Sequence, residues 1–428
     1  MGIVLPQIPR ELGLAGRADR GDWMSFRAFS PAGPYWRALA RNAPRVGALC
    51  GLVLAGCAGQ GPNFGEEPQF PVAAQQAQIG NPTGVRVGLI LPLGASGNAG
   101  AAAQSMRNAA ELALAEFANP NIQLIVKDDG GTAQGAQAAA EQVLNEGAEI
   151  VLGPLFSHAV AAAGQTTRNR GVPMIAFSTD ANVAARGVYL LSFLPETDVE
   201  RIIGYAVANG RKSFIALFPD NAYGTVVEGT FQQVVAARGA RIVALEHYPN
   251  DPQRMADPVR KVAAAARQAD AVFIADAADA TPQLVQALVA NGVSPRRVKL
   301  IGTGLWDDPR LLTDPNMTGA WYAAPDSAGF RAFTQRYRAR FGSEPARAAS
   351  LAYDAVSLVA ALVKTQGPNR FSEEILANPS GFAGTDGVFR LRSDGTSERG
   401  LAIMEIQRDG ARVISPVPKS FATQSASN

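Results

Sequence analysis

From residue 85 onwards, short apolar runs alternate with longer stretches whose apolar residues recur at helical spacing. The first run, Val85–Leu91, stops at Pro92, and the Ala-rich stretch 101–117 that follows has the spacing of a helix. The alternation continues with expected strands and helices in turn at 123–127, 133–145, 149–152, 157–170 and 174–177. Strands that are apolar on both faces and separated by helices predict a parallel sheet covered on both sides.

The pattern then restarts and predicts a second α/β unit of similar size. Its expected strands lie at 213–217, 241–246, 271–275 and 298–302. Its expected helices lie between them, at 226–237, 255–266 and 282–291. The chain after Trp321 predicts two more helices, at 330–341 and 348–365, and strands at 388–391 and 402–407 that a turn at Ser393-Asp-Gly395 joins.

These two units predict a two-lobed protein whose chain crosses between lobes near Leu194, Ala323 and Gly387. The predicted lobes are residues 85–196 plus 324–386 and residues 197–323 plus 387–416, with a tail at 417–428. Several crossings make a hinge, and ligands commonly bind between two such lobes. Neither unit contains G-x-G-x-x-G or G-x-x-x-x-G-K-[ST], so the sequence offers no phosphate loop for a nucleotide.

The N-terminal region has the pattern of an export signal. Arginines at 37, 41 and 45 precede an apolar run at 46–56, which is too short to span a bilayer. The run ends in Leu54-Ala-Gly-Cys57, which resembles the bacterial lipobox and implies a diacylglycerol on the Cys57 thiol. We therefore expect a signal peptide at 1–56, with Met24 as an alternative start. A buried helix that happens to end in cysteine is the competing interpretation.

Residues 57–84 are rich in Gln, Pro, Gly and Ala and predict a lipidated flexible tether. A flexible chain of this length spans roughly 25–30 Å. The protein is thus expected to be exported and held by lipid at the periplasmic face of a bacterial membrane. No later segment reaches about 18 uninterrupted apolar residues, so no spanning helix is predicted.

Composition narrows the chemistry. The net charge is +2 over 428 residues, which gives no electrostatic case for a nucleic-acid partner. The only cysteines are Cys50 and Cys57, so disulfides and cysteine-based metal sites are excluded from the folded body. The only histidines are His158 and His247. We therefore expect no cofactor, no metal and no enzymatic activity, since hydrolysis needs a nucleophile with its base or a metal.

Six motifs occur in order over roughly 85–414: Gly88-Leu-Ile-Leu-Pro-Leu93, Asp128-Asp129, Val151-Leu-Gly-Pro154, Gly171-Val-Pro-Met-Ile175, Asp220-Asn-Ala-Tyr-Gly224 and Leu351-Ala-Tyr-Asp-Ala-Val356. Together they resemble the type I periplasmic binding proteins of the leucine/isoleucine/valine class. The resemblance implies an α/β fold in which each lobe is a doubly wound, mostly parallel sheet flanked by helices. It also implies a clamp that closes on a small solute and delivers it to an ABC permease.

The resemblance also implies which residues touch a solute. Ser157 matches the serine that grips the headgroup, and it also lies where it could cap the next helix; the two roles are compatible. Ser178, Thr179 and Asp180 fall in the second contact loop, with a spacing ambiguous by one residue. Tyr223 matches the tyrosine that covers the ligand, or else it is a packing residue at a helix start.

Two departures from the family's pattern concern the second lobe. Amino-acid binders carry an aromatic after the strand expected at 271–275, where this chain has Asp276. They carry an acid after the strand expected at 298–302, where this chain reaches Asp307 only five residues later. Either aspartate could substitute for that acid, because a buried ammonium without a carboxylate partner is costly. Trp306 and Trp321 either stack on a ligand or pack in the protein.

Two functions remain open. The first is a solute-binding lipoprotein of an ABC importer, with a small polar ligand of the amino-acid class. The second is an outer-membrane lipoprotein regulator that resembles the penicillin-binding-protein activators, which share this fold and touch a peptidoglycan synthase. The displaced acid, the tether and the segment Pro195-Glu-Thr-Asp198 at the first crossing fit that second function. His158 is expected to be solvated at a helix start or to line the cleft.

Overall fold

The computed structural model describes residues 78–421 except 82, 119, 250, 252–253 and 419. These residues belong to one compact unit of the chain. The predicted signal peptide and Cys57 lie outside the described residues. Within the described part, no helix is long and apolar enough to cross a membrane.

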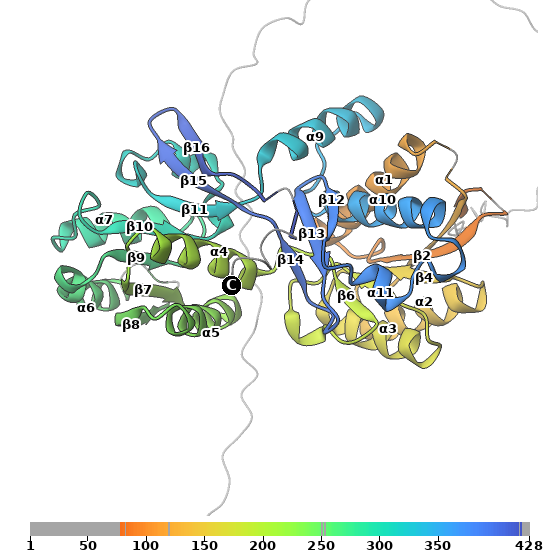
Figure 1. Cartoon of the computed structure of the whole chain (residues 1–428), viewed down its shortest axis with the longest axis horizontal. Coiled ribbons are helices and arrows are strands. Elements are labelled where there is room, and N and C mark those ends of the chain that lie inside the picture. The colour runs from red at the N-terminus through yellow and green to blue at the C-terminus, as the bar shows by residue number, and fades with distance from the viewer. Residues whose placement is uncertain are drawn as a thin grey trace, which may run out of the picture. The chain divides into compact units, whose positions relative to one another are not determined.

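The first lobe is built on a six-stranded sheet in the order β1-β3-β2-β4-β5-β6, in which only β1 runs antiparallel. Its strands are β1 (Gln78–Gly80), β2 (Val85–Leu91), β3 (Ile122–Asp128), β4 (Ile150–Leu152), β5 (Met174–Ala176) and β6 (Val188–Leu190). The helices around it are α1 (Gly97–Glu116), α2 (Ala133–Asn145), α3 (Ser157–Asn169), α9 (Ser327–Phe341) and α10 (Ala349–Thr365). The predicted mostly parallel sheet is confirmed (Figure 1).

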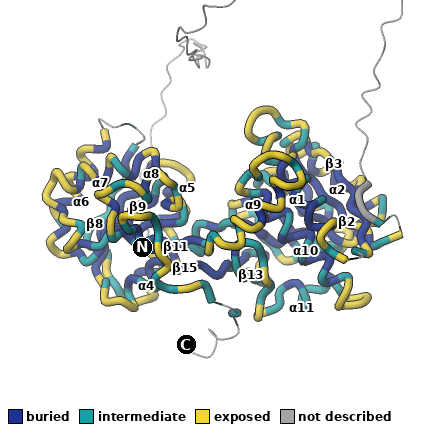
Figure 2. Tube along the Cα trace, turned by 90° about the horizontal axis from the view of Figure 1, so that it is seen from above, coloured by how far each residue is buried: buried dark blue, intermediate teal, exposed yellow. Residues whose placement is uncertain are grey.

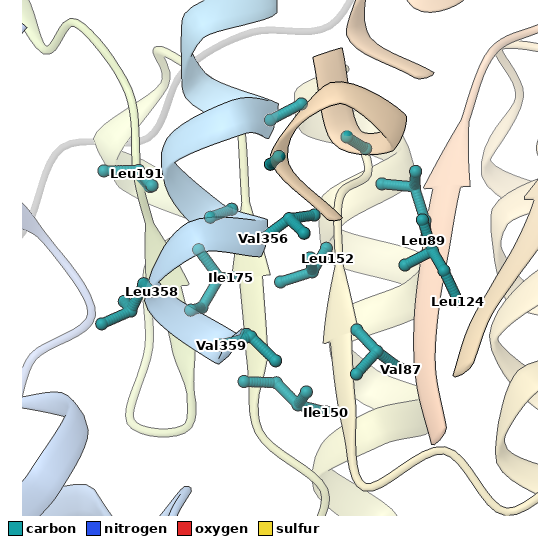
Figure 3. Packing of buried hydrophobic residues seen from close by; sticks show 14 of the residues in the cluster. Val87, Leu89, Leu124, Ile150, Leu152, Ile175, Leu191, Val356, Leu358 and Val359 are labelled. Atoms are coloured by element: carbon teal, nitrogen blue, oxygen red, sulfur yellow. The ribbon is translucent and has the colours of Figure 1, made fainter. Parts of the chain in front are cut away.

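Both faces of this sheet are buried because its strands are apolar on both sides, as in β2, where six of seven residues are buried. On one face, α1 and α10 pack over alternate strand residues such as Val87, Leu89 and Ile150 (Figure 3). On the other face, α2 and α3 pack over Ile90, Val151 and their neighbours. The helix α10 comes from far along the chain, so the first lobe is assembled from two separate segments.

The second lobe is built on a seven-stranded sheet in the order β16-β15-β11-β10-β9-β7-β8. Its strands are β7 (Ser213–Pro219), β8 (Arg241–Tyr248), β9 (Ala271–Ile274), β10 (Lys299–Gly302), β11 (Trp321–Ala324), β15 (Ala402–Gln407) and β16 (Gly410–Ser415). Strands β7 to β11 are parallel to one another, whereas β15 pairs antiparallel with β11 and β16 pairs antiparallel with β15. One face is covered by α4 (Pro195–Ala208) and α5 (Ala222–Ala237), the other by α6 (Ala256–Ala265) and α7 (Thr281–Ala290).

A small antiparallel sheet of β12 (Phe382–Gly384), β13 (Gly387–Leu391) and β14 (Ser397–Arg399) precedes the last passage of the chain into the second lobe. Phe389 and Leu391 belong to a core of the first lobe, whereas Leu401 belongs to a core of the second. The boundary predicted at 387 therefore falls before a strand that packs with the first lobe. The turn at 393–395 joins β13 to β14, so the prediction that it joins 388–391 directly to 402–407 is wrong.

Charged side chains are buried beside this small sheet. Asp386 is fully buried and accepts two hydrogen bonds from the Arg347 guanidinium, at 2.9 and 2.7 Å. The guanidinium of Arg399 is buried between the rings of Phe193 and Phe389, with its carbon 5.0 and 5.7 Å from the ring centroids. Ion pairing and guanidinium–aromatic contact thus hold the segments where the chain crosses between lobes. Buried residues fill the centre of each lobe in Figure 2.

Candidate ligand-binding site

The first lobe presents Ser157 at the point where its sheet reverses strand order. From β2 the chain continues to β3 on one side of the sheet, whereas from β4 it continues to β5 on the other side. In doubly wound sheets, ligands bind at the carboxyl ends of the strands beside such a reversal. Gly153, directly after β4, has φ +84, and a Cβ there would lie 2.0 Å from the carbonyl oxygen of Ile90. Glycine therefore lets the chain pass closely over β2 before α3 begins at Ser157.

Among the described residues, no side chain caps the N-terminus of α3. Its N-cap residue is Phe156, so the predicted capping role of Ser157 is wrong by one position. Ser157 is the first residue of the helix, is partly exposed, and makes no side-chain hydrogen bond within the described part of the chain. The free N–H groups and dipole of a helix start favour a carboxylate, so this edge suits the acidic end of a small solute.

In the loop after β5, two of the three predicted ligand residues make hydrogen bonds within the loop itself. Ser178 is buried, and its hydroxyl accepts a hydrogen bond from the Asp180 N–H at 3.1 Å. Asp180 accepts from the N–H and side-chain amide of Asn182, at 3.0 and 2.9 Å. Thr179 between them is exposed. The ligand roles of all three stay predictions, with Thr179 the most accessible.

The loop after β3 contributes a buried acid that is not among the predicted ligand residues. Asp129 is buried, and one carboxylate oxygen accepts a 2.7 Å hydrogen bond from the Gly131 N–H. Burial raises the pKa of Asp129, and the Gly131 hydrogen bond opposes that rise. His158 lies 2.9 Å from the carbonyl oxygen of Gly131 and stacks on Phe156, so it joins this loop to the start of α3. The motif Asp128-Asp129 was the available signal.

In the second lobe, Tyr223 is already engaged. It is the second residue of α5, whose N-cap Asn221 accepts a hydrogen bond from the Gly224 N–H at 2.9 Å. The Tyr223 hydroxyl lies 2.8 Å from the hydroxyl of Thr303, which is buried after β10. Burial raises the pKa of Tyr223, so this phenol stays protonated. Its predicted contact with a ligand stays a prediction, and its observed contact is with Thr303.

The two candidate aspartates also have partners inside the second lobe. Asp276 accepts hydrogen bonds from the Tyr248 hydroxyl at 2.6 Å and from the Ala277 N–H at 2.7 Å. Asp307 is exposed and accepts from the Tyr322 hydroxyl at 3.0 Å. Each is therefore held by a tyrosine of its own lobe, and a ligand role for either stays a prediction.

The two tryptophans pack in the protein. Trp306 is fully buried in a core of the second lobe, and its indole N–H donates to the Asp276 carbonyl at 3.1 Å. Trp321 is partly exposed, with the Lys299 ammonium 4.4 Å from its ring centroid and Tyr205 against its edge. The structure thus decides the alternative for Trp306 in favour of packing.

A further acid reaches this edge from α4. Asp198 accepts a hydrogen bond from the Gly304 N–H at 2.9 Å, and desolvation raises its pKa to about 7. The second-lobe set is therefore Asp198, Tyr223, Thr303 and Asp276, whereas the first-lobe set is Ser157, Ser178, Thr179 and Asp129. No hydrogen bond or ion pair between the described residues joins the two sets. The sequence indicates Asp198 only as part of the crossing segment Pro195-Glu-Thr-Asp198.

A cavity of about 430 Å³ has none of these residues on its walls. It is lined by residues of α4 and β14 and by the segment that leads into β15, with Arg201, Tyr205, Arg238 and Phe421 on its walls. None of the predicted ligand residues lines it. The candidate site is therefore the pair of sheet edges and not this cavity.

The arrangement of two doubly wound lobes agrees with a comparison of the sequence with family models. The model described as periplasmic binding protein matches residues 84–411, more than three quarters of the chain. The chain belongs to the periplasmic binding protein family. Its type I fold, expected from the six motifs, is confirmed.

Solved structures share the fold of this periplasmic binding protein. A candidate branched-chain amino acid ABC transporter from Rhodospirillum rubrum has a TM-score of 0.68 at 20% identity, covering 77% of this chain and 100% of that one. A branched-chain amino acid ABC transporter ligand-binding protein from Burkholderia xenovorans gives 0.62 at 17%, covering 78% and 96%. An ABC transporter solute-binding protein from Rhodopseudomonas palustris, in complex with 3,4-dihydroxybenzoic acid, gives 0.54 at 22%, covering 78% and 99%.

Among curated proteins, an uncharacterized protein of Rickettsia prowazekii is 23% identical over 134 residues. The match covers 31% of this chain and 36% of that protein's length. At this identity and coverage the comparison assigns no activity to the periplasmic binding protein.

Proposed function

We propose that this periplasmic binding protein captures a small polar solute of the amino-acid class between its lobes and delivers it to the permease of an ABC importer. The observation that carries the proposal is the uncapped start of α3 at Ser157, at the reversal point of the first sheet. Backbone N–H groups there are free to bind the carboxylate that every amino acid carries. Thr179, exposed after β5, supplies a hydroxyl at the carboxyl edge of the same sheet.

The similar structures support a ligand that carries a carboxylate, but they differ in the rest of the ligand molecule. Two of them are described in terms of branched-chain amino acid transport, and a third holds 3,4-dihydroxybenzoic acid. These compounds share a carboxylate and differ in the rest. The first lobe would bind the shared group, and the second lobe would select among solutes.

We also propose that the protein is exported and anchored by a lipid on Cys57, with residues 57–77 as a tether. The tether predicted at 57–84 extends too far, because Gln78–Gly80 form strand β1 of the first sheet. Support comes from the lipobox match and from the membership of a periplasmic family. The mass of the mature N-terminal peptide tests this: a diacylglycerol-modified Cys57 is expected, and an N-terminus elsewhere would contradict it.

A second candidate function, regulation of a peptidoglycan synthase, is favoured by the second lobe. Tyr223, Asp276 and Asp307 are each hydrogen-bonded to another residue of that lobe. A protein that acts by contact alone needs no open polar groups there. This candidate keeps the lipid anchor and replaces the permease by a synthase at the outer membrane.

The protein is first unfolded and refolded so that any bound ligand is removed. Isothermal titration of this ligand-free protein against the twenty amino acids then separates the two functions. Transport predicts heat and saturation with at least one amino acid, at a Kd of micromolar or tighter, which is about −8 kcal/mol. Refolding is checked by circular dichroism. No binding to any amino acid by folded protein would contradict the transport proposal and leave the regulator, which a pull-down with a membrane synthase then tests.

A further inference from the structure

The chain leaves the second lobe again after β16. Residues 410–415 form this strand, which pairs with β15 at the edge of the second sheet. The Ser415 hydroxyl accepts a 2.7 Å hydrogen bond from the guanidinium of Arg201 on α4. Arg201 also donates to the carbonyl of Leu401, directly before β15, at 2.8 Å. The end of β16 is therefore fixed to the second lobe.

The aromatic ring of Phe421, six residues beyond Ser415, is buried beside the small sheet of β12, β13 and β14. Phe421 is only 1% exposed, and the guanidinium carbon of Arg390 on β13 lies 4.7 Å from its ring centroid. Gly381, directly before β12, has φ +74, and a Cβ there would lie 2.9 Å from the ring. Glycine at 381 thus leaves the space that the ring occupies.

The small sheet that holds this ring is attached to the first lobe. Phe389 and Leu391 of β13 are part of a core of that lobe. The Leu190 N–H of β6 also donates to the carbonyl of Gly395, in the turn between β13 and β14, at 2.8 Å. The sheet lies between the two large sheets (Figure 1). A segment that starts at β16 and ends on this sheet therefore leads from the second lobe back to the first.

Between its two ends, the segment packs against the passage that leads from β14 into β15. A Cβ at Gly400 in that passage would lie 3.1 Å from side-chain atoms of both Val417 and Pro418, and a Cβ at Gly387 would lie 3.3 Å from Val417. Pro418 and Phe421 share the walls of the cavity of about 430 Å³ with residues of α4. Part of the segment is therefore separated from α4 by open space.

We propose that residues 416–421 form a strap, an additional link between the lobes that is held by the Phe421 ring and limits how far the lobes rotate about their crossings. The six residue steps from Ser415 to Phe421 span at most about 20 Å. A larger separation between the end of β16 and the small sheet requires the ring to leave its site. Burial of a phenylalanine side chain favours the attached strap by roughly 10–100-fold.

The strap concerns the movement of the lobes and not the chemistry of the solute. Two-lobed proteins open and close by rotation about a few residues at their crossings, and a further short link restricts that rotation. The inference therefore stands or falls independently of which solute binds.

A simpler interpretation is that Phe421 only covers the small sheet. In that case the length of chain between β16 and the ring has no effect on the lobes. A Gly/Ser insertion after Pro418, as long as the strap itself, separates the two roles because it keeps the ring and lengthens the link. Phe421→Ala removes the anchor, whereas Phe421→Leu keeps an apolar side chain there. Val413→Ala on β16 is the control, since Val413 is an exposed apolar residue.

The test is the distance between two spin labels, one on each lobe, measured by double electron–electron resonance. The labels are placed at Ala138→Cys in α2 and Ala290→Cys in α7, both exposed helix positions. The full chain carries Cys50→Ser and Cys57→Ser, so that only the introduced thiols are labelled. Circular dichroism checks that each variant is folded.

The strap predicts a narrow distance distribution for the otherwise unchanged chain. Phe421→Ala and the insertion are both expected to broaden it and to add distances that the strapped protein does not populate. Phe421→Leu and Val413→Ala are expected to leave it unchanged. An insertion variant with the original distribution would overturn the strap and leave Phe421 as a packing residue. Should Phe421→Ala fail to fold, the insertion variant, in which the ring is intact, decides the question by itself.

Discussion

The two sheet edges that form the candidate site are built on the same topology and differ in how their polar groups are used. In the first lobe, Ser157 makes no side-chain hydrogen bond within the described chain, and the start of α3 has no side-chain cap. In the second lobe, Tyr223 and Asp276 are bonded to Thr303 and Tyr248. The first edge offers free donors to a ligand, whereas the second is satisfied internally.

This difference follows from what lies beneath each edge. Trp306 fills the space under the second edge: its ring packs against Gly302, where a Cβ would lie 2.2 Å from the ring, and its N–H reaches the Asp276 carbonyl. The first edge is shaped by backbone, through Gly153 passing over β2. One lobe of a binding protein can thus offer open hydrogen-bond donors while the other lobe has a fixed shape. The lobe with open donors would supply affinity, and the lobe of fixed shape would supply selectivity.

The largest expected effect comes from removing the aromatic support of the second edge. Trp306→Ala leaves a cavity in a fully buried core and is expected to lower the free energy of unfolding by about 3–5 kcal/mol. Guanidinium denaturation followed by tryptophan fluorescence and circular dichroism measures it. Trp321→Ala is the control, because Trp321 is partly exposed and should cost less. Equal losses for both variants would contradict the special support given by Trp306.

A smaller effect is expected from breaking one internal bond of the second edge. Tyr223→Phe removes the hydroxyl that lies 2.8 Å from Thr303 and leaves a buried Thr303 hydroxyl without that partner. The expected loss is about 0.5–1.5 kcal/mol of unfolding free energy. Tyr205→Phe is the control, since no hydrogen bond of the Tyr205 hydroxyl is present among the described residues. A Tyr223→Phe variant as stable as that control would show that the contact adds nothing.

The sequence predicted the strands and helices of both lobes well because their periodicity is strong. The strand Val85–Leu91 and the helix Ala133–Asn145 have the bounds that the pattern indicated. The sequence did not predict α4, which begins at Pro195 where only a crossing between lobes was expected. It also did not predict the strands β1, β6, β11, β12, β14 and β16. All of these strands except β16 have only three or four residues, which carry too little periodicity to be recognised.

Site residues were harder to predict because their roles depend on partners far along the chain. The hydroxyl contact of Tyr223 with Thr303 joins residues 80 positions apart, and Asp198 meets Gly304 over 106 positions. The resemblance located the loops that carry Ser157, Ser178 and Tyr223. It gave no sign that an acid from α4 enters the second edge, because that contact depends on how α4 packs on the sheet.

The central claim is that the free start of α3 at Ser157 holds the carboxylate of the solute. Calorimetric titration of Ser157→Ala and wild type with the best-binding amino acid of the panel tests it most directly, with Ser294→Ala, an exposed serine outside the site, as the control. The hydroxyl bond to a charged group predicts a loss of about 1.5–3 kcal/mol, which is roughly 10–100-fold in Kd, with unfolding free energy changed by less than about 1 kcal/mol. A Kd unchanged from wild type in folded Ser157→Ala protein would contradict the account.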